Sequence, residues 1–331
     1  MAGLPSLNLR SLIVGTMLTK TKSVTAAVVA AGGTGYQVGD LIILPNHVHL
    51  TVDTVTTGAV ATVSITNAGS IYAGVDDPVN PVASETSVGS GTGSTFNLTW
   101  SENAVFGDIG TATPDVPVAI GTLAQAEAKF GQGSELHRMF KSFFQNNFAN
   151  EVWAGPVAEP AGATAATGTI KVLTPPTEAG TIHLYIGGQH VPVNIGGTDL
   201  KEEVALAIID AIIAHDDLPV EPDIGTTNDE VTLTCTFKGI NGNEIRVESN
   251  YYGQIGGEVT VPGLTLEYPA TGFLTGGSGT PEFDNLITNM GEQEFEYVAM
   301  PYCDSTSLGA WEEEYGFSDQ GRWGHQGSLA A

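Results

Sequence analysis

The residues of this sequence that could act in catalysis or metal binding are its histidines, its cysteines and a few glycine-rich loops. Two imidazoles occur at i and i+2 in Asn46-His47-Val48-His49, so on a strand both lie on one face. They could chelate a metal if a third ligand came from elsewhere. The sequence identifies no such ligand, so we interpret the pair as surface histidines, with a metal site as the alternative. Separate elements are predicted to carry the other histidines, His183, His190, His215 and His325.

The two cysteines indicate neither a zinc site nor a disulfide framework. Cys235 lies inside VTLTCTF and Cys303 inside MPYCDS, far apart and without C-x-x-C spacing. We expect both to be small buried residues in a reducing compartment.

The glycine-rich loops at residues 32–39 and 89–96 do not match a phosphate-binding motif. Neither leads into a helix whose N-terminus could hold a phosphate, and no Gly-Lys-Ser/Thr follows. Ser278 lies in GGSGT, which lacks the last glycine of a nucleophile elbow, and the chain has no H-E-x-x-H. We therefore assign no catalytic, cofactor-binding or metal-binding residue and expect no cofactor and no enzymatic activity. An enzyme is kept as an alternative because triads are assembled in space.

The charge balance excludes some classes of partner. Eleven Lys and Arg against 37 Asp and Glu give a net charge of −26, which argues against binding nucleic acid or an anionic membrane and favours a basic partner. Residues 312–314 are three consecutive glutamates, which form either a solvated helix face or a docking surface. We expect no signal peptide at the N-terminus, and no run approaches the roughly 20 apolar residues of a membrane helix.

Residues 122–153 carry the strongest local signals and predict a helix, a turn, a second helix and a strand. Thr122 with Gln125 forms a capping box, Gly131 ends the first helix, and Ser134 caps the second. The second helix has an apolar stripe made of Leu136, Met139, Phe140, Phe143 and Phe144. The opposite face is expected to carry His137, Arg138, Lys141 and Gln145.

Short apolar runs predict the strands against which that stripe is buried. They occur at residues 9–14, 116–120, 151–157 and 296–302. Helices are expected from residue 283 to 290 and after Asp304 or Ser305, the last one carrying Leu308, Trp311 and Tyr315. Alternating strands and helices indicate an α/β layer.

Residues 23–100 alternate β-branched residues with glycine turns, without helical periodicity, which predicts an all-β module. GTGY at 33–36 is echoed by GSIY at 69–72, and each tyrosine is expected to pack over the glycine of its own turn. The repeat predicts two similar hairpin units that share one core. The glycines at 89–93 form a turn before a strand at 95–100.

Residues 163–275 predict a second module, of α+β type, between a small-residue linker at 158–167 and a hinge at 275–281. Its strands are expected at residues 169–173, 181–186, 191–195, 230–237, 244–249 and 264–268, with Gly187-Gly188 as a hairpin turn.

The single helix of this module is predicted to begin with a capping box formed by Asp199 and Glu202. Its end is expected at Asp216, Asp217 and Pro219. The predicted buried face consists of Val204, Ala207, Ile208, Ala211 and Ile212.

The predicted fold is thus an α/β core domain, with a mixed sheet and helices, that carries two insertions. The core is discontinuous and comprises residues 1–22, 101–162 and 276–331. The insertions are the all-β glycine-rich module at 23–100 and the α+β module with one helix at 163–275.

The arrangement and the residues together resemble the Mu-like contractile-tail sheath family of bacteriophages. The matching stretches cover residues 9–22 and 104–323, about seventy per cent of the chain. In chain order they include LRSLIVGTML, AEAKFGQGSELHRMFKSFFQNN with EVWAGPVAEPAGATAATGTI, LYIGGQHVPV, FKGINGNEIRVESNYYG and EFEYVAMPYCDSTSLGAWEEEYG.

The resemblance implies a structural virion protein that polymerises as stacked rings around a tail tube and contracts to drive the tube into the host. Implied partners are further copies of the chain, the tail tube protein, and baseplate and tail terminator proteins. Nucleic acid binding and membrane insertion are not expected. The implied location is the phage tail, after assembly in the host cytoplasm. The glycine-rich module lies outside the family pattern and is expected to project outward.

The resemblance also implies terminal segments that we expect to be missing from this sequence. The family has an N-terminal arm and a further domain beyond the position of Arg322, and these join subunits by strand exchange. Only eight residues precede Leu9 and the sequence stops at Ala331, so a fragment or a short form is expected. Residues 9–14 are the terminal candidate for exchange. The alternative function is that of a phage decoration or host-recognition protein, which exposed aromatic residues on the β module would favour.

Overall fold

The structure is a computed structural model. It describes residues 10–17, 21–46, 48–69, 71–72, 77–102, 110–146, 151–215, 217–291, 293, 295 and 297–316. In this part of the chain, no helix has both the length and the apolar character required to cross a bilayer. Leu9, His47, Asp216, Arg322 and His325, on which some sequence predictions rest, lie outside the described residues.

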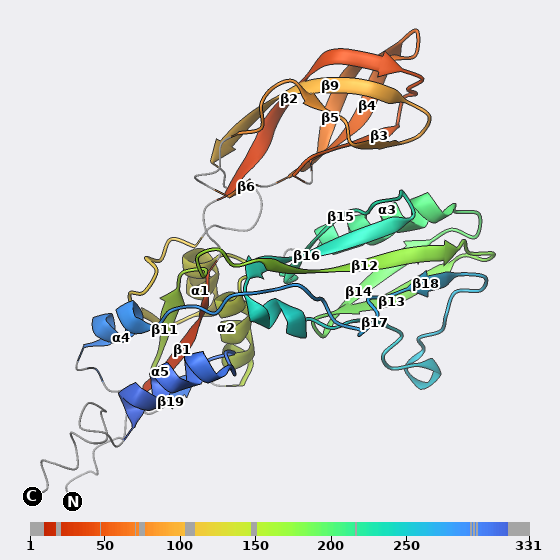
Figure 1. Ribbon diagram of the computed structural model, residues 1–331. Coiled ribbons are helices and arrows are strands. Elements are labelled where there is room, and N and C mark those ends of the chain that lie inside the picture. The colour runs from red at the N-terminus through yellow and green to blue at the C-terminus, as the bar shows by residue number, and fades with distance from the viewer. Residues whose placement is uncertain are drawn as a thin grey trace, which may run out of the picture.

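A mixed four-stranded sheet in the order β10-β11-β1-β19, here called the core sheet, is the centre around which helices α1, α2, α4 and α5 are arranged (Figure 1). β1 runs parallel to both β11 and β19, and β10 runs antiparallel to β11. The strands are Arg10–Thr16 (β1), Val118–Ile120 (β10), Glu151–Val157 (β11) and Tyr297–Ala299 (β19). The helices are Leu123–Phe130 (α1), Glu135–Asn146 (α2), Asp284–Met290 (α4) and Ser305–Tyr315 (α5).

β1 is buried on both faces, which accounts for its unbroken apolar run. Leu12 belongs to one cluster with Leu286 of α4 and Trp311 of α5. Ile13 belongs to another cluster, with Phe140 of α2. Because side chains alternate along a strand, α1 and α2 cover one face of the core sheet, and α4 and α5 cover the other. Burial on both faces is typical of parallel strands in α/β layers.

The predicted cap at the start of α1 is confirmed. The Gln125 N–H donates to Thr122 Oγ1 over 3.2 Å. The Gln125 side chain accepts from the Gly121 N–H at 2.9 Å. Gly131, with φ of 81°, follows the last helical residue, as expected for a position that disfavours a Cβ.

α2 also begins at its predicted cap, since Ser134 Oγ accepts from the His137 N–H at 3.0 Å. Within the predicted apolar stripe, Leu136 and Phe140 are fully buried. The Phe140 ring stacks on Phe130 of α1 with ring centroids 5.7 Å apart. The other members of the stripe, Met139, Phe143 and Phe144, are half-buried.

α5 begins at Asp304, as predicted. Its carboxylate accepts the backbone N–H groups of Thr306 and Ser307, each at 3.0 Å. Of the three residues expected to pack, Trp311 is buried, whereas Leu308 remains 41% exposed.

Residues 21–102 form a β-sandwich of two four-stranded antiparallel sheets, in the orders β6-β2-β9-β7 and β5-β4-β3-β8. The first sheet contains Thr21–Thr34 (β2), Ile71–Tyr72 (β6), Val82–Ala83 (β7) and Thr92–Glu102 (β9). The second contains Leu41–Leu44 (β3), Val48–Thr56 (β4), Ala59–Ala68 (β5) and Thr86–Val88 (β8). One apolar cluster, which includes Ile42, Leu50, Phe96 and Trp100, joins the two sheets.

Tyr36 packs on a different glycine from the one predicted. It is 2% exposed and lies against Gly91, where an added Cβ would meet the ring at about 2.1 Å. Its hydroxyl is 2.8 Å from Ser94 Oγ. The Tyr36 ring therefore connects two turns that are distant in sequence, whereas the prediction placed the contact within one turn. Gly91 belongs to the run predicted as a turn.

Residues 165–267 form two further sheets, in the orders β15-β16-β12-β18 and β14-β13-β17, which share one apolar core with helix α3. The first contains Ala165–Thr174 (β12), Val220–Ile224 (β15), Glu230–Lys238 (β16) and Thr265–Glu267 (β18). The second contains Gly180–Ile186 (β13), Gln189–Ile195 (β14) and Val247–Ser249 (β17). The helices are Lys201–Ile213 (α3) and the 3₁₀ segments Ile240–Glu244 (η1) and Gln254–Gly256 (η2).

The predicted start of α3 was wrong by one residue. Glu203, and not Glu202, closes the cap by accepting the Leu200 N–H at 2.8 Å. The Asp199 carboxylate instead accepts the Gly196 N–H at 2.6 Å, so it stabilises the turn before the helix. The residues that α3 buries are Val204, Ala205, Ile208, Ile209 and Ile212, whereas the predicted Ala207 and Ala211 are half-buried.

Two more local predictions need correction. The strand expected at 244–249 is restricted to Val247–Ser249, because η1 extends to Glu244 and Arg246 forms only an isolated bridge with Phe273. Cys235 is buried as predicted, but Cys303 is exposed, and neither forms a disulfide.

The chain enters and leaves both modules through adjacent segments. Lys22 of β2 pairs with Glu102 of β9. Thr164 and Thr167 form bridges with Ser278 and Thr275. Adjacent ends are the geometry that an inserted module requires. On this basis we propose the division into a core, the β-sandwich and the α+β module (β12–β18 with α3).

Candidate functional site

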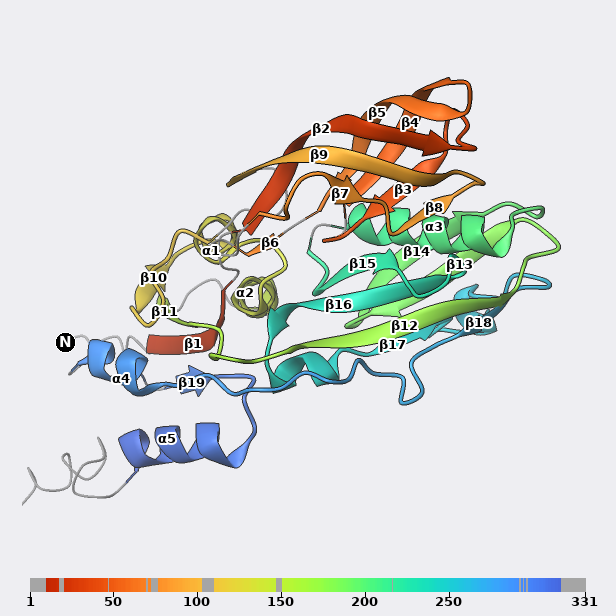
Figure 2. The same ribbon diagram turned by 45° about the horizontal axis from the view of Figure 1, so that its top comes forward.

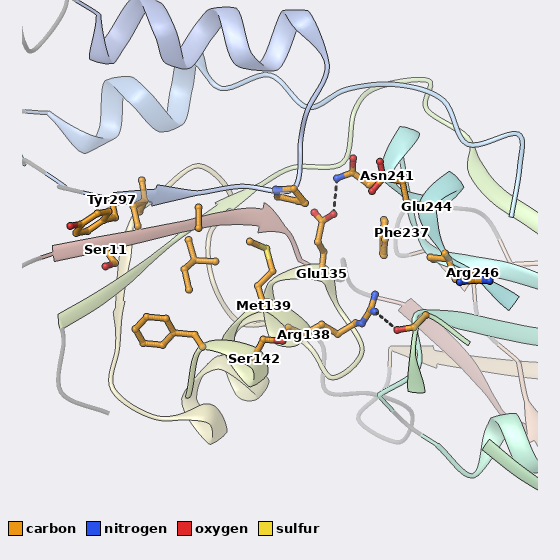
Figure 3. A pocket seen from close by; sticks show the side chains of 17 residues that line it. Ser11, Glu135, Arg138, Met139, Ser142, Phe237, Asn241, Glu244, Arg246 and Tyr297 are labelled. Carbon is orange, nitrogen blue, oxygen red and sulfur yellow. Dashed lines mark hydrogen bonds between the residues drawn. The ribbon is translucent and has the colours of Figure 1, made fainter. Parts of the chain in front are cut away.

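A cavity of about 720 Å³ opens where the core sheet meets the α+β module. Ser11 of β1, Arg138 of α2 and Tyr297 of β19 line it from the core side. Asn241 of η1 and Arg246 line it from the module side (Figure 3). No residue was predicted to act here. The possible role of the cavity is therefore inferred from the hydrogen bonds that its polar groups already make.

Glu135, the first residue of α2, is the central polar group of this junction and is only 6% exposed. Its Oε2 accepts from the Thr16 N–H at 3.0 Å, from the Thr16 hydroxyl at 3.1 Å and from the Tyr302 hydroxyl at 2.7 Å. Its Oε1 accepts from Asn241 Nδ2 at 2.8 Å. One carboxylate thus joins β1, α2, the segment before α5 and η1.

These bonds make Glu135 a structural acceptor whose lone pairs face donors of the protein itself. Four donors occupy most of the lone-pair positions of a carboxylate. Burial, together with the Glu135 charge, raises the pKa of Tyr302 well above its usual value, so the phenol keeps its proton and remains a donor.

Two cations of α2 strengthen the same junction. Arg138 Nη2 donates to the Gly187 carbonyl in the β13–β14 turn over 3.4 Å (Figure 3). Lys141 forms an ion pair with Asp217 beyond the end of α3. Both side chains were predicted on the polar face of α2. The structure places them against the α+β module, so this face of α2 forms the interface between the core and the α+β module.

His137 was predicted on the exposed face of α2, and that prediction was wrong. Its side chain is 4% exposed, and its Nδ1 accepts the Gly133 N–H over 3.1 Å. The ring closes the turn that precedes the helix. Burial lowers the pKa of His137 below 6.5, because the charged imidazolium loses hydration there.

We predict that His137 makes the fold less stable in acid. The pKa is depressed in the folded state, so between that value and about 6.5 the unfolded chain binds more protons, and stability falls as pH falls. His137→Asn keeps an acceptor near the Nδ1 position but does not titrate. In urea titrations between pH 7.5 and 5, the stability of the wild type should fall toward that of the variant, by about 1.4 kcal/mol per unit of pKa depression. Parallel pH profiles for the two proteins would contradict this role.

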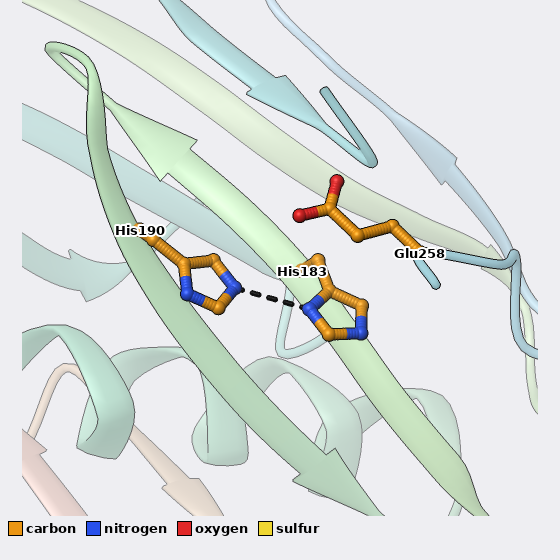
Figure 4. A group of neighbouring side chains, drawn as sticks. All are labelled: His183, His190 and Glu258. Atoms are coloured by element: carbon orange, nitrogen blue, oxygen red, sulfur yellow. Dashed lines mark hydrogen bonds between the residues drawn. The ribbon is translucent and has the colours of Figure 1, made fainter. Parts of the chain in front are cut away.

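His183 and His190, which were predicted to lie on separate elements, meet Glu258 beside the β13–β14 hairpin. His183 Nδ1 lies 3.0 Å from His190 Nε2 (Figure 4). The buried Glu258 carboxylate faces the pair, and one ligand atom from each of the three lies within 4.8 Å of the others. The sequence contained a usable signal: a two-residue Gly187-Gly188 turn sets the register and places His190 opposite Tyr185 and diagonal to His183.

His49, predicted as one of two surface histidines, is 3% exposed. Its Nε2 lies 3.1 Å from Asp223 Oδ1 of β15, so it joins the β-sandwich to the α+β module. Asn228 Nδ2 also reaches the Ser87 carbonyl of the sandwich over 3.4 Å. Figure 2 shows β3 and β8 lying next to α3 and β15. The sandwich therefore packs on the α+β module of the same chain.

Most of these polar residues connect structural units of the chain to one another. The chain matches no protein-family model. It is 32% identical over 199 residues to the Mu-like prophage FluMu tail sheath protein of Haemophilus influenzae strain Rd. The alignment covers 60% of this chain and 39% of that protein, so the match spans about two-fifths of the relative's length. The predicted resemblance to the Mu-like tail sheath family is confirmed by this similarity.

Proposed function

We propose that this chain is a structural subunit of a bacteriophage contractile tail sheath. It would polymerise as stacked rings around a tail tube and contract to drive the tube into the host. The observation that carries the proposal is the 32% identity over 199 residues to a protein named as a tail sheath. We assign no catalytic residue to this function.

The core sheet supports the proposal because it ends on strands that can accept a further strand. Its outer strands are β10 and β19, and Tyr297 of β19 is 60% exposed. An added strand supplies main-chain hydrogen bonds that can persist while subunits rotate. Residues 9–14 do not fit the exchanging role expected of them: β1 lies inside the sheet and pairs with β11 on one side and β19 on the other. We therefore propose the β19 edge as the acceptor.

The proposed partners are further copies of the chain, the tail tube protein, and baseplate and tail terminator proteins. The proposed location is the phage virion, after assembly in the host cytoplasm. Glu312 and Glu313 of α5 are exposed and lie beside the half-buried Glu314. They offer a negative surface to a cationic tube protein.

Negative-stain microscopy of the purified protein, or of the particles that contain it, tests the proposal. Rings or helical tubes are expected. Isolated fibres or monomers would favour the alternative, a decoration or host-recognition protein. That alternative gains no support from the described side chains of the sandwich, where Tyr36, Phe96 and Trp100 are all buried.

The proposed contact with the tube makes a separate prediction about salt. If the acidic face of α5 docks on a cationic tube protein, co-assembly should weaken steeply above about 0.15 M salt, where charges are screened within about 8 Å. Co-sedimentation of the two proteins at increasing salt measures this. The triple change of Glu312, Glu313 and Glu314 to Gln should abolish most of the salt dependence. Co-assembly that ignores salt would exclude this docking surface but not the rings themselves.

A further inference from the structure

We propose that His183, His190 and Glu258 bind one divalent transition-metal ion of the zinc type. The three side chains come from β13, β14 and the loop after η2, and they offer two imidazole nitrogens and one carboxylate oxygen (Figure 4). Two histidines and one carboxylate form a common protein ligand set for zinc, with the remaining position taken by water.

The distances suit a small ion after limited movement. The facing ring nitrogens are 3.0 Å apart. Two nitrogens on a tetrahedral zinc, each about 2.0–2.1 Å from the metal, lie about 3.3 Å apart. The rings are nearly coplanar, with an interplanar angle of 9°, so both must also turn until their facing nitrogens point at one ion. His190 is exposed, which leaves its side chain room to turn.

The two rings now hold each other through one N–H···N bond, so one imidazole carries its proton on the facing nitrogen. Metal binding requires that this ring carry its proton on the other nitrogen. Both facing nitrogens then have a free lone pair, and no net proton is released.

The carboxylate is held in place by partners of its own. Glu258 Oε1 accepts from the Tyr185 hydroxyl, and Oε2 accepts from the Tyr252 N–H at 2.9 Å. Such outer contacts orient a ligand before the metal arrives.

A metal at this position would join the loop around η2 to the β13–β14 hairpin. That loop exposes Tyr251 (59%), Tyr252 (64%) and Ile255 (104%), and its two tyrosine rings contact Tyr185 of β13. An ion that binds only the folded form adds stability by mass action. The expected consequence is a metal-dependent rise in the melting temperature and slower hydrogen exchange in residues 251–258.

The test is titration of the EDTA-treated chain of residues 1–331 with ZnCl₂ by calorimetry, and with CoCl₂ by visible absorption. We expect one ion per chain and the absorption bands of nitrogen-ligated cobalt. His190→Ala should weaken zinc binding by at least tenfold, because an exposed ligand is removed without a core change. Glu258→Gln should weaken it similarly while keeping the shape of the side chain.

His215→Ala is the matched control, since it removes a half-buried histidine of the same module that bonds to its own helix at the Ala211 carbonyl. It should bind zinc as the wild type does. The proposal is overturned if the wild type takes up no zinc at 0.1 mM. It is also overturned if His190→Ala binds as tightly as the wild type, since binding would then come from surface carboxylates.

Discussion

Replacing Glu135 with alanine should lower the free energy of unfolding by about 4 kcal/mol, the largest single loss that we expect in the α/β core. The substitution leaves the Thr16 N–H, the Thr16 and Tyr302 hydroxyls and the Asn241 amide without their acceptor. Each orphaned buried donor costs about 1–3 kcal/mol. The full sum will not be reached, because water from the adjacent cavity can satisfy some of these groups.

Denaturant unfolding followed by circular dichroism measures this loss. Glu135→Gln is the informative intermediate, since the glutamine amide has only one acceptor atom. We expect it to lower the free energy of unfolding by about 1–3 kcal/mol. Glu244→Gln is the matched control: it lines the same cavity but is exposed, so a change within about 0.5 kcal/mol is expected. An equal, small effect of all three substitutions would show that Glu135 does not hold the junction together.

The sequence predicted well the features whose hydrogen bonds connect residues only a few positions apart. Thr122 and Ser134 each cap a helix by accepting the backbone N–H of the residue three positions later. Threonine and serine are preferred cap residues, so the residue types alone predict the cap. β11 was predicted with its observed bounds, because a short apolar run followed a helix with a clear stripe. Local chemistry was sufficient at these positions.

The features that escaped prediction depend on contacts between distant segments. Asn241 meets Glu135 across 106 positions of sequence, and Asp223 meets His49 across 174. Nothing near His49 marks it as buried. No rule of spacing could relate these residues.

β15 escaped prediction for a different reason. Pro222 lies in the strand, and a proline disfavours a strand prediction because it has no backbone N–H to donate. The strand is nevertheless tolerated because it is the outermost one of its sheet, where a missing N–H costs little.

The run Leu41-Ile42-Ile43-Leu44 indicates that this strand is in contact with a second module. Side chains alternate along a strand, so four apolar residues in a row indicate burial on both faces. Ile42 and Leu44 pack inside the sandwich. Ile43 is 2% exposed and belongs to the core cluster of the α+β module, with Leu41 packed against the same cluster. β3 is therefore shared between two cores.

Replacing Ile43 with aspartate should separate the sandwich from the α+β module at a cost of about 3 kcal/mol. The apolar contact of a buried isoleucine is worth about 2–5 kcal/mol, and an unpaired carboxylate cannot remain in that contact. Separation exposes β15, so its amides should exchange hydrogen on the order of tenfold faster or more. Val38→Asp is the matched control, since it adds the same charge to the same module at a site that is 65% exposed.

A double-mutant cycle between His49 and Asp223 distinguishes separation from general loosening. In the wild-type background their alanine substitutions should couple by about 0.5–3 kcal/mol, because the two side chains are hydrogen-bonded. In the Ile43→Asp background the coupling should vanish, since the modules no longer hold the pair together. Coupling that persists there would mean that the polar bond holds the modules together without the apolar contact. It would then be the bond between His49 and Asp223, and not Ile43, that keeps the sandwich packed on the α+β module.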